Sequence, residues 1–206
     1  MKENQNRRTF LRDTLLIGTG VTVGALLPNV FRGSSRQMVL ADDKEAAGSA
    51  EQRLKELGIK LPPPPKPVAI YIPAVRVGNL VYSSGHGPGR VNGKPVRGRI
   101  GDGLTLEQGY DAARLTGLNV LSSVRNVLGD LDKVVRLVKV LGMVNCTPDF
   151  TDQPKVINGF SELMVQVFGE KNGKGARSAV GMSSLPGNIP CEIEAIFEVR
   201  TQACLF

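Results

Sequence analysis

Hydrophobic residues from position 68 onward follow the spacing of alternating strands and helices. The runs 68–73 and 75–85 have the β-branched and aromatic bias of strands. Between Thr105 and Gly129, apolar residues recur every three to five positions, which predicts one amphipathic helix. The valine-rich run 132–146 has apolar residues on both faces, so it predicts a central strand that is covered on at least one side.

A second helix is predicted to end at Gly169. Asp149 or Asp152 can cap its N-terminus, and Pro154 is tolerated in its first turn. Its buried side is marked by apolar residues at helical spacing, namely Val156, Phe160, Leu163, Met164 and Val167. The predicted domain therefore contains two helices.

Gly- and Pro-rich segments mark the loops between the predicted strands. Residues 87–103 predict a loop with a turn at Asn92-Gly93. Near the C-terminus, residues 176–182 and the alternating run 191–200 are expected to form a hairpin across the turn-rich 183–190. The order β-β-α-β-α-β-β predicts an α+β domain with two helices packed on one face of a mixed sheet.

The chain before position 68 is expected to lie outside this domain. Residues 42–60 are charged and helix-prone, and the Pro-rich 61–67 predicts an extended spacer because proline interrupts helices. The predicted organisation is an N-terminal segment over 1–41, a charged segment and linker over 42–67, and a domain over 68–206.

The first 41 residues resemble a twin-arginine export signal. Arg7 and Arg8 precede Phe10, and a weakly apolar run rich in Gly and Thr follows over 14–28. That run is shorter than the ~20 apolar residues of a membrane span. The resemblance implies recognition by an export receptor, cleavage after Ala41 and a periplasmic location. The alternative is an ordinary basic tail.

The charge balance argues against a nucleic-acid partner for the domain. The chain has 26 Lys and Arg against 19 Asp and Glu, a net charge of +7. Residues 1–41 hold six basic and two acidic side chains, so only +3 remains after position 41. Tryptophan is absent and aromatic residues make up 5%, which is unlike the stacking platforms that bind single-stranded nucleic acid.

The cysteines and the histidine predict neither a metal site nor a fixed disulfide. Cys146, Cys191 and Cys204 are widely spaced and form no CxxC pair, and His86 is the one histidine in the chain, so a zinc set is not available. Buried free thiols are expected, although an exported chain could pair two of the three. No cofactor is predicted.

Two groups of charged residues have both a functional and an ordinary interpretation. Arg177 stands among small residues; it can hold a carboxylate through two hydrogen bonds, or it can be a solvated loop charge. Glu192, Glu194 and Glu198 share one face of the last strand, which is either solvated or in contact with a partner subunit. A desolvated Glu there could act as acid, base or water-positioning group. His86 could be a general base, or a loop or interface residue.

Stretches over about residues 68–200 resemble the reactive-intermediate deaminase family, also called RidA, YjgF-type or L-PSP. The most specific is "GARSAVGMSSLPGNIPCEIEAIFEV", which is similar to the family's A-R-S/T-x-V, L-P and E-I-E-A signature. "VGNLVYSSGHGP" is similar to its strand followed by S-G-Q-x-P, and "VINGFSELMVQVFGE" to its second helix. Asn119 falls where the family has a helical asparagine.

The resemblance implies a chorismate-mutase-like α+β fold and a homotrimer with clefts between adjacent subunits. It implies hydrolysis of reactive enamines and imines, of the 2-aminoacrylate type, to 2-keto acids and ammonia without a cofactor. The expected ligand is a small carboxylate-bearing imine or 2-keto acid. A non-catalytic metabolite-binding protein on the same fold is the alternative, and ribonuclease activity, reported for some members, fits the charge and aromatic content least.

Carried over residue by residue, the resemblance implies that Arg177 holds the substrate carboxylate and Glu192 orients the attacking water. Tyr71 is expected to line the cleft, and the backbone N–H of Ala179 to contact the substrate. Asn158 matches an asparagine to which we give a structural role.

The sequence also departs from the family pattern around the expected cleft. His86 stands where glutamine is usual, and residues 181–184 replace a more polar run. The loop over 87–105 is longer than in the family. These residues border the expected cleft, so the resemblance leaves the choice of substrate open even if Arg177 and Glu192 keep their roles.

Overall fold

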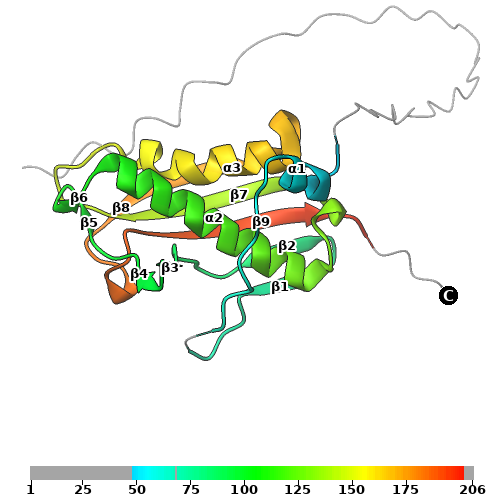
Figure 1. The fold of residues 1–206 in the computed structure, drawn as a ribbon, viewed down its shortest axis with the longest axis horizontal. Coiled ribbons are helices and arrows are strands. Elements are labelled where there is room, and N and C mark those ends of the chain that lie inside the picture. Colours follow the sequence, from blue (N-terminus) through cyan, green and yellow to red (C-terminus); the bar gives the residue numbers. More distant parts are fainter. Residues whose placement is uncertain (1–47, 68, 202–206) are drawn as a thin grey trace, which may run out of the picture. The chain divides into compact units, whose positions relative to one another are not determined.

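The structure is a computed structural model that describes residues 48–67 and 69–201 (Figure 1). The helices are α1 (Ala50–Glu56), α2 (Leu106–Leu128) and α3 (Gln153–Gly173), with short 3-10 turns η1 (Leu131–Lys133) and η2 (Pro186–Asn188). The strands are β1 (Ala74–Val77), β2 (Leu80–Ser83), β3 (Arg90–Val91), β4 (Lys94–Pro95), β5 (Arg99–Ile100), β6 (Gly103–Leu104), β7 (Val134–Asn145), β8 (Ala176–Met182) and β9 (Cys191–Val199). Within the described ranges, no helix is both long enough and apolar enough to cross a membrane. The predicted export signal lies outside these ranges.

Five strands form one mixed sheet in the order β1-β2-β9-β7-β8. The valine-rich β7 is central, as predicted, and pairs antiparallel with β9 and parallel with β8. The predicted hairpin between β8 and β9 is wrong, because β7 lies between these two strands. The chain passes from β7 to β8 through α3, and such a helical crossover brings the following strand back parallel to the first. Residues 183–190 then carry the chain across the end of β7 to β9.

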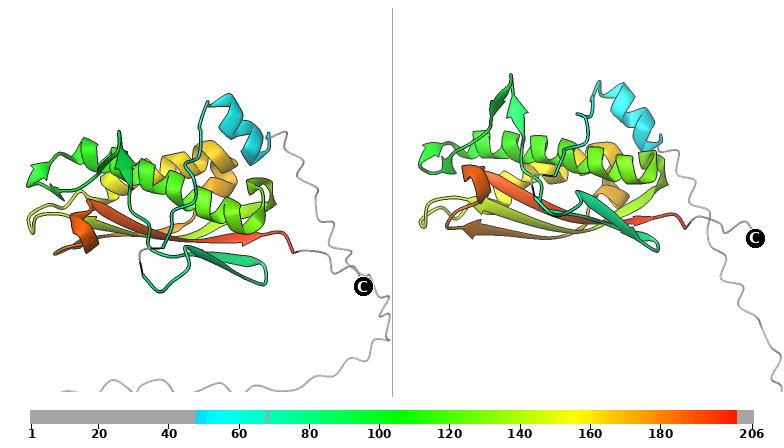
Figure 2. Two further views of the ribbon diagram at one scale, coloured as in Figure 1. Left: turned by 60° about the horizontal axis from the view of Figure 1, so that its bottom comes forward. Right: turned by 90° about the horizontal axis from the view of Figure 1, so that it is seen from below.

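Helices α2 and α3 cover one face of this sheet, which confirms the predicted fold class (Figures 1 and 2). α2 begins at a capping box: Thr105 accepts a hydrogen bond from the backbone of Gln108, and the Gln108 side chain accepts one from the backbone of Thr105. α3 follows Asp152, carries Pro154 in its first turn and is interrupted at Gly169, where φ is 82°. Among the described residues, no helix lies on the other face, which we call the open face.

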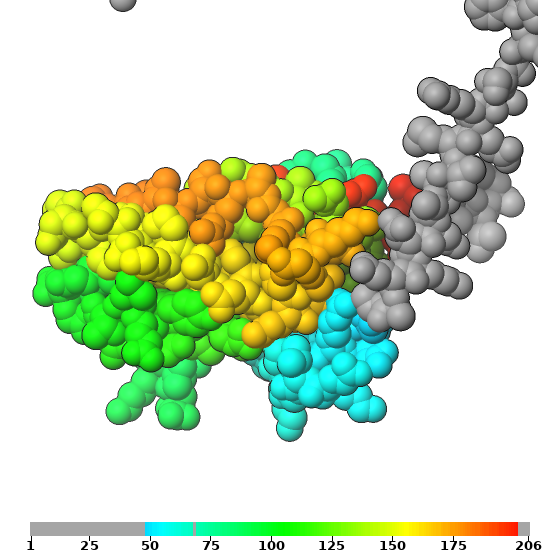
Figure 3. Space-filling model, turned by 90° about the horizontal axis from the view of Figure 1, so that it is seen from above, coloured from blue at the N-terminus to red at the C-terminus, as the bar shows by residue number. Residues whose placement is uncertain are grey.

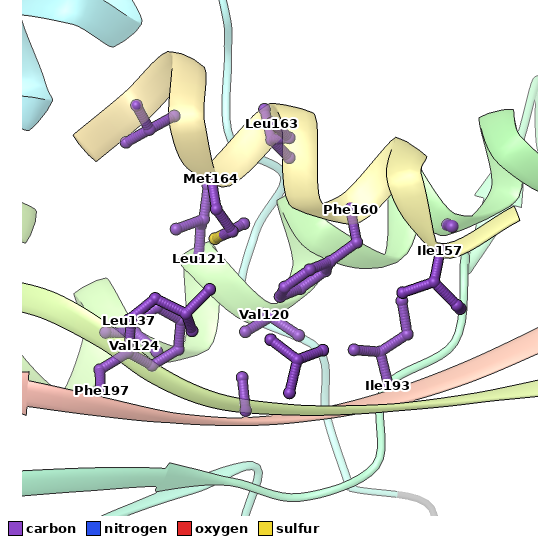
Figure 4. Close-up of a cluster of buried hydrophobic side chains, with 14 of the residues drawn as sticks. Val120, Leu121, Val124, Leu137, Ile157, Phe160, Leu163, Met164, Ile193 and Phe197 are labelled. Atoms are coloured by element: carbon purple, nitrogen blue, oxygen red, sulfur yellow. The ribbon is translucent and has the colours of Figure 1, made fainter. Parts of the chain in front are cut away.

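The core fills the space between the two helices and the sheet (Figure 4). Phe160 and Leu163 of α3 pack against α2 at Gly117, and the ring centroid of Phe168 in α3 lies 6.1 Å from that of Phe197 in β9. All four side chains are buried. The helices approach closely at Gly159, where an added Cβ would lie 2.1 Å from the backbone oxygen of Tyr110. A glycine is therefore needed at this crossing for steric reasons.

The domain begins earlier than the sequence predicted. Ala50 and Leu54 of α1 are buried in the main core, and α1 packs beside α3 (Figure 3). Glu51 forms an ion pair with Arg125 at 3.0 Å and accepts a hydrogen bond from the backbone N–H of Leu131. The Pro-rich strap, residues 61–67, is extended as expected, but it lies along the domain and is not a free linker. Ser122 Oγ fixes the strap by donating a hydrogen bond to the carbonyl oxygen of Pro62 at 2.6 Å.

Two local predictions are confirmed. Asn92 and Gly93 have φ of 50° and 75° and join β3 to β4, as expected for a two-residue turn with positive φ at both positions. Cys146 and Cys191 are buried free thiols, while Cys204 lies outside the described residues. Burial raises the pKa of the Cys191 thiol to about 12, so this side chain is inert as a nucleophile.

Candidate functional site

Some of the sequence-predicted site residues meet at an open pocket of about 790 Å³. The pocket is formed by the strap, the segment before β1, the loop after β2, and β9. Its lining includes Lys66, Tyr71, His86, Asn119, Glu192 and Glu194. Three of the predicted site residues, Tyr71, His86 and Glu192, therefore share one surface, although they lie far apart in the sequence.

The Glu192 carboxylate occupies a space that exists because residue 85 is glycine. A Cβ on Gly85 would lie 1.9 Å from Glu192 Oε1, so the carboxylate fills the position of the missing side chain. Glu192 is only partly exposed, whereas Glu194, two residues on, is exposed. Partial burial, and secondarily the negative charge of Glu194, raise the pKa of Glu192. A carboxylate of raised pKa at a pocket surface can accept a proton from water.

This pKa shift predicts that Glu192→Gln stabilises the fold at neutral pH. The pKa of Glu192 is higher in the folded than in the unfolded chain, so its contribution to stability is fully present at low pH and is lost as the pH rises through the folded pKa. Glutamine avoids the cost of the ionised form. Thermal unfolding should show a higher Tm for the variant at pH 7 and a smaller difference at pH 4.

Glu198→Gln provides the matched control for this effect. Glu198 lies on the same strand and the same face but does not line the pocket. Its variant should show a smaller difference in Tm between the two pH values. A Glu192→Gln protein that is less stable than wild type at pH 7 would contradict the assignment.

His86 lines the pocket but is not available as a general base. Its side chain is buried, with Nδ1 2.7 Å from the carbonyl oxygen of Ser84 and Nε2 2.8 Å from Ser123 Oγ. A carbonyl oxygen accepts only, so Nδ1 carries the proton and Nε2 accepts from the Ser123 hydroxyl. Burial lowers the pKa of His86, which favours the same neutral form. Both ring nitrogens are thus engaged, and the general-base interpretation has no free nitrogen to act through.

Arg177 is held in place by two side chains of α3. Its Nη1 donates to Asn158 Oδ1 at 2.8 Å and to Ser161 Oγ at 3.0 Å. Because one nitrogen makes both contacts, the other donors of the guanidinium can meet a ligand. Arg177 lines a separate hollow of about 230 Å³ with Ser161 and Lys174, and it is absent from the pocket that contains Glu192.

Arg177 and Glu192 lie on opposite faces of the sheet within one chain. In the register, Arg177 is beside Val140 of β7, whose side chain is buried under the helices. Glu192 is beside Met143, on the open face and three residues further along β7. Their backbones are therefore about 14 Å apart, from three steps of about 3.3 Å along the strand and two strand spacings of about 4.8 Å. One chain does not bring the two residues to one small ligand.

The remaining predicted residues have different positions relative to the pocket. Tyr71 lines it and is exposed. Ala179 lies in the edge strand β8, half-buried against the core and away from the pocket. Sequence reasoning missed Ser161 as an Arg177 partner, although its spacing of three from Asn158 places both on one helix face. It also missed Lys66, because the strap was assigned to a linker.

The comparisons with known proteins agree with this fold. Residues 51–199 match the sequence model of the family described as "YjgF/chorismate_mutase-like, putative endoribonuclease". Protein TCP17 of Trypanosoma cruzi is 41% identical over 155 residues, which are 75% of this chain and 97% of that protein. The mitochondrial protein MMF1 of Saccharomyces cerevisiae is 31% identical over 144 residues, 69% of this chain and 83% of that protein.

Crystal structures give the same result. Atu1372 from Agrobacterium tumefaciens, a protein of unknown function, is 44% identical with a TM-score of 0.66, and the match covers 73% of this chain and 92% of that one. A protein from Shewanella oneidensis, described as a "putative endoribonuclease", is 27% identical with a TM-score of 0.69, and the match covers 74% of this chain and 100% of that one. Both the sequence and the structure show that the chain belongs to the YjgF family.

Proposed function

We propose that this protein hydrolyses reactive 2-imino acids, and the enamines in equilibrium with them, to 2-keto acids and ammonia. The observation that carries the proposal is the Glu192 carboxylate, partly buried against Gly85 in an open pocket, with a raised pKa. Tyr71 lines the same pocket. The family resemblance in the E-I-E-A signature supports the same role for Glu192.

The chemistry needs little more than a positioned water. Glu192 accepts a proton from water as the water oxygen attacks the carbon of the protonated imine, which gives a neutral tetrahedral carbinolamine. Glu192 then returns this proton to the amine, the C–N bond breaks, and the hydroxyl proton passes to the departing ammonia, so the products are the 2-keto acid and ammonium. Arg177 fixes the substrate carboxylate through a two-pronged hydrogen bond, so the imine carbon is held near Glu192.

This mechanism requires Arg177 and Glu192 to come from different copies of the chain. The two residues lie on opposite faces of one sheet, and Arg177 is on the edge strand β8. The open face carries Val75, Tyr82 and Val180, all substantially exposed, which suits burial against another copy. The homotrimer expected from the resemblance would bring the edge strand of one copy to the open face of the next.

Ammonia release tests the proposal directly. Iminopropionate is generated from alanine by an amino-acid oxidase, and its hydrolysis is followed with and without the purified protein. We expect acceleration by the wild type and a fall of about 100-fold with Glu192→Gln, because the general base is removed. Gly85→Ala should also reduce the rate, since the new methyl group would displace the carboxylate from its place.

Equal rates with and without protein would rule out the deaminase. Saturable binding of 2-keto acids without turnover would then favour the metabolite-binding protein. A ribonuclease would instead cleave RNA at a rate that Glu192→Gln and Arg177→Ala both reduce in parallel, which a contaminating nuclease would not show.

A further inference from the structure

The strap brings one basic residue into the pocket, and that residue has no function in the mechanism above. Lys66 and Pro65 line the same pocket as Glu192 and Glu194. Among the described residues, Lys66 makes no hydrogen bond or ion pair. It is an exposed cation at the wall of a pocket that otherwise contains two carboxylates.

The position of Lys66 is restricted by two contacts earlier in the chain, one in α1 and one near the start of the strap. Leu54 is 4% exposed and anchors α1 in the core. Ser122 Oγ then donates to the carbonyl oxygen of Pro62, four residues before Lys66. Four consecutive prolines, 62–65, restrict the backbone between this contact and the pocket. This stiff segment therefore restricts Lys66 to one region of the pocket wall.

The pocket also has room for more than a three-carbon substrate. Its volume of about 790 Å³ falls in the range of roughly 300–1,000 Å³ that holds drug-sized ligands. With the imine carbon at Glu192, a longer side chain has space to extend along the pocket towards the strap. A negatively charged end would meet the unpaired ammonium of Lys66.

We propose that Lys66 makes the site selective for 2-imino acids, and the corresponding 2-keto acids, whose side chain ends in a carboxylate. This rests on the proposed function for the turnover of such imines, but the binding preference can be measured without turnover. Arg177 of a second copy holds the α-carboxylate, and Lys66 holds the distal one. Lys66 acts as a specificity residue and takes no part in the proton transfers.

Glu194 is expected to disfavour acidic ligands, which is the opposite of the effect of Lys66. It lines the same pocket and its negative charge contributes to the raised pKa of Glu192. An acidic ligand end is repelled by Glu194 and attracted by Lys66. Removing each charge should therefore change the preference for acidic ligands in opposite directions.

Binding of two stable 2-keto acids tests the proposal. Calorimetry on the full chain gives Kd for 2-oxoglutarate, with a distal carboxylate, and 2-oxobutyrate, without one. The wild type should prefer 2-oxoglutarate. Lys66→Ala should reduce this preference about 2- to 5-fold, as expected for loss of one solvent-screened charge contact, and Lys66→Glu should reduce it further. Glu194→Gln should increase it.

Lys60→Ala is the matched control, because Lys60 is an exposed lysine just before the strap that does not line the pocket. The Lys60→Ala variant should prefer 2-oxoglutarate over 2-oxobutyrate to the same degree as the wild type. The same preference in Lys66→Ala as in the wild type would overturn the role of Lys66, even if iminopropionate is hydrolysed. A Lys66-dependent preference without ammonia release would support the selectivity and contradict the deaminase. If neither keto acid binds, the selectivity proposal fails, while ammonia release still decides the deaminase separately.

Discussion

Arg177→Ala is expected to lower kcat/KM for iminopropionate hydrolysis by about 100-fold. The loss follows from the charge-assisted, two-pronged contact with the substrate carboxylate, worth about 3 kcal/mol at a partly desolvated site. Asn158 and Ser161 hold one nitrogen of the guanidinium, so the group is oriented before the substrate arrives. Arg177→Lys keeps the charge but not the fork, and should lie between the alanine variant and the wild type.

Arg114→Ala is the control that separates this effect from a general loss of an arginine. Arg114 also donates to a polar side chain of α3, the Gln166 Oε1 at 2.8 Å, but on the surface away from the sheet. Its variant should retain wild-type kcat/KM. Because the contacts of Arg177 are exposed, Tm should change little in either variant. Wild-type kcat/KM in Arg177→Ala would remove Arg177 from the mechanism.

Gly159→Ala is expected to cause the largest loss of stability. Its Cβ would lie 2.1 Å from the Tyr110 oxygen and 2.9 Å from the Tyr110 carbonyl carbon, and both are backbone atoms of α2. No side-chain rotation can relieve that clash, so the two helices must move apart and the core between them must loosen. A cost of about 3 kcal/mol, near the top of the usual range for overpacking, would lower Tm by roughly 10 °C.

Lys155→Ala is the control for the effect on stability of a substitution elsewhere in α3. Lys155 is exposed and pairs with Asp152 at the start of the helix, a contact that contributes little. Differential scanning calorimetry of the three proteins should separate a large loss for Gly159→Ala from a small one for Lys155→Ala. A Gly159→Ala protein with the wild-type Tm would mean that α2 and α3 are not packed as described.

The helices and the central strand could be predicted because their patterns are local. Thr105, Gly129 and the apolar spacing between them define α2 without reference to any other element. The pairing of β8 could not be predicted in this way, since a turn-rich segment before an alternating strand is equally typical of a hairpin. In the structure, α3 carries the chain back so that β8 runs parallel to β7, on the side of β7 opposite β9.

The site could be predicted in part. Tyr71, His86 and Glu192 do share a pocket. The face on which each side chain lies depends on register across three strands, and register is a property of the assembled sheet. For that reason the separation of Arg177 from Glu192 was not foreseen. Gly85 was not recognised either, because its role depends on the approach of β9 and not on its own neighbours.

The anchoring of α1 and the strap has a practical consequence for shortening the chain. The composition of residues 42–67 would suggest trimming the protein at position 68 to obtain a minimal domain. Such a cut would remove Leu54 from the core and the Glu51 partner of Arg125, and would expose the apolar surface beneath them. A minimal version that keeps the pocket wall complete should start before Ser49, whose hydroxyl caps the first helix.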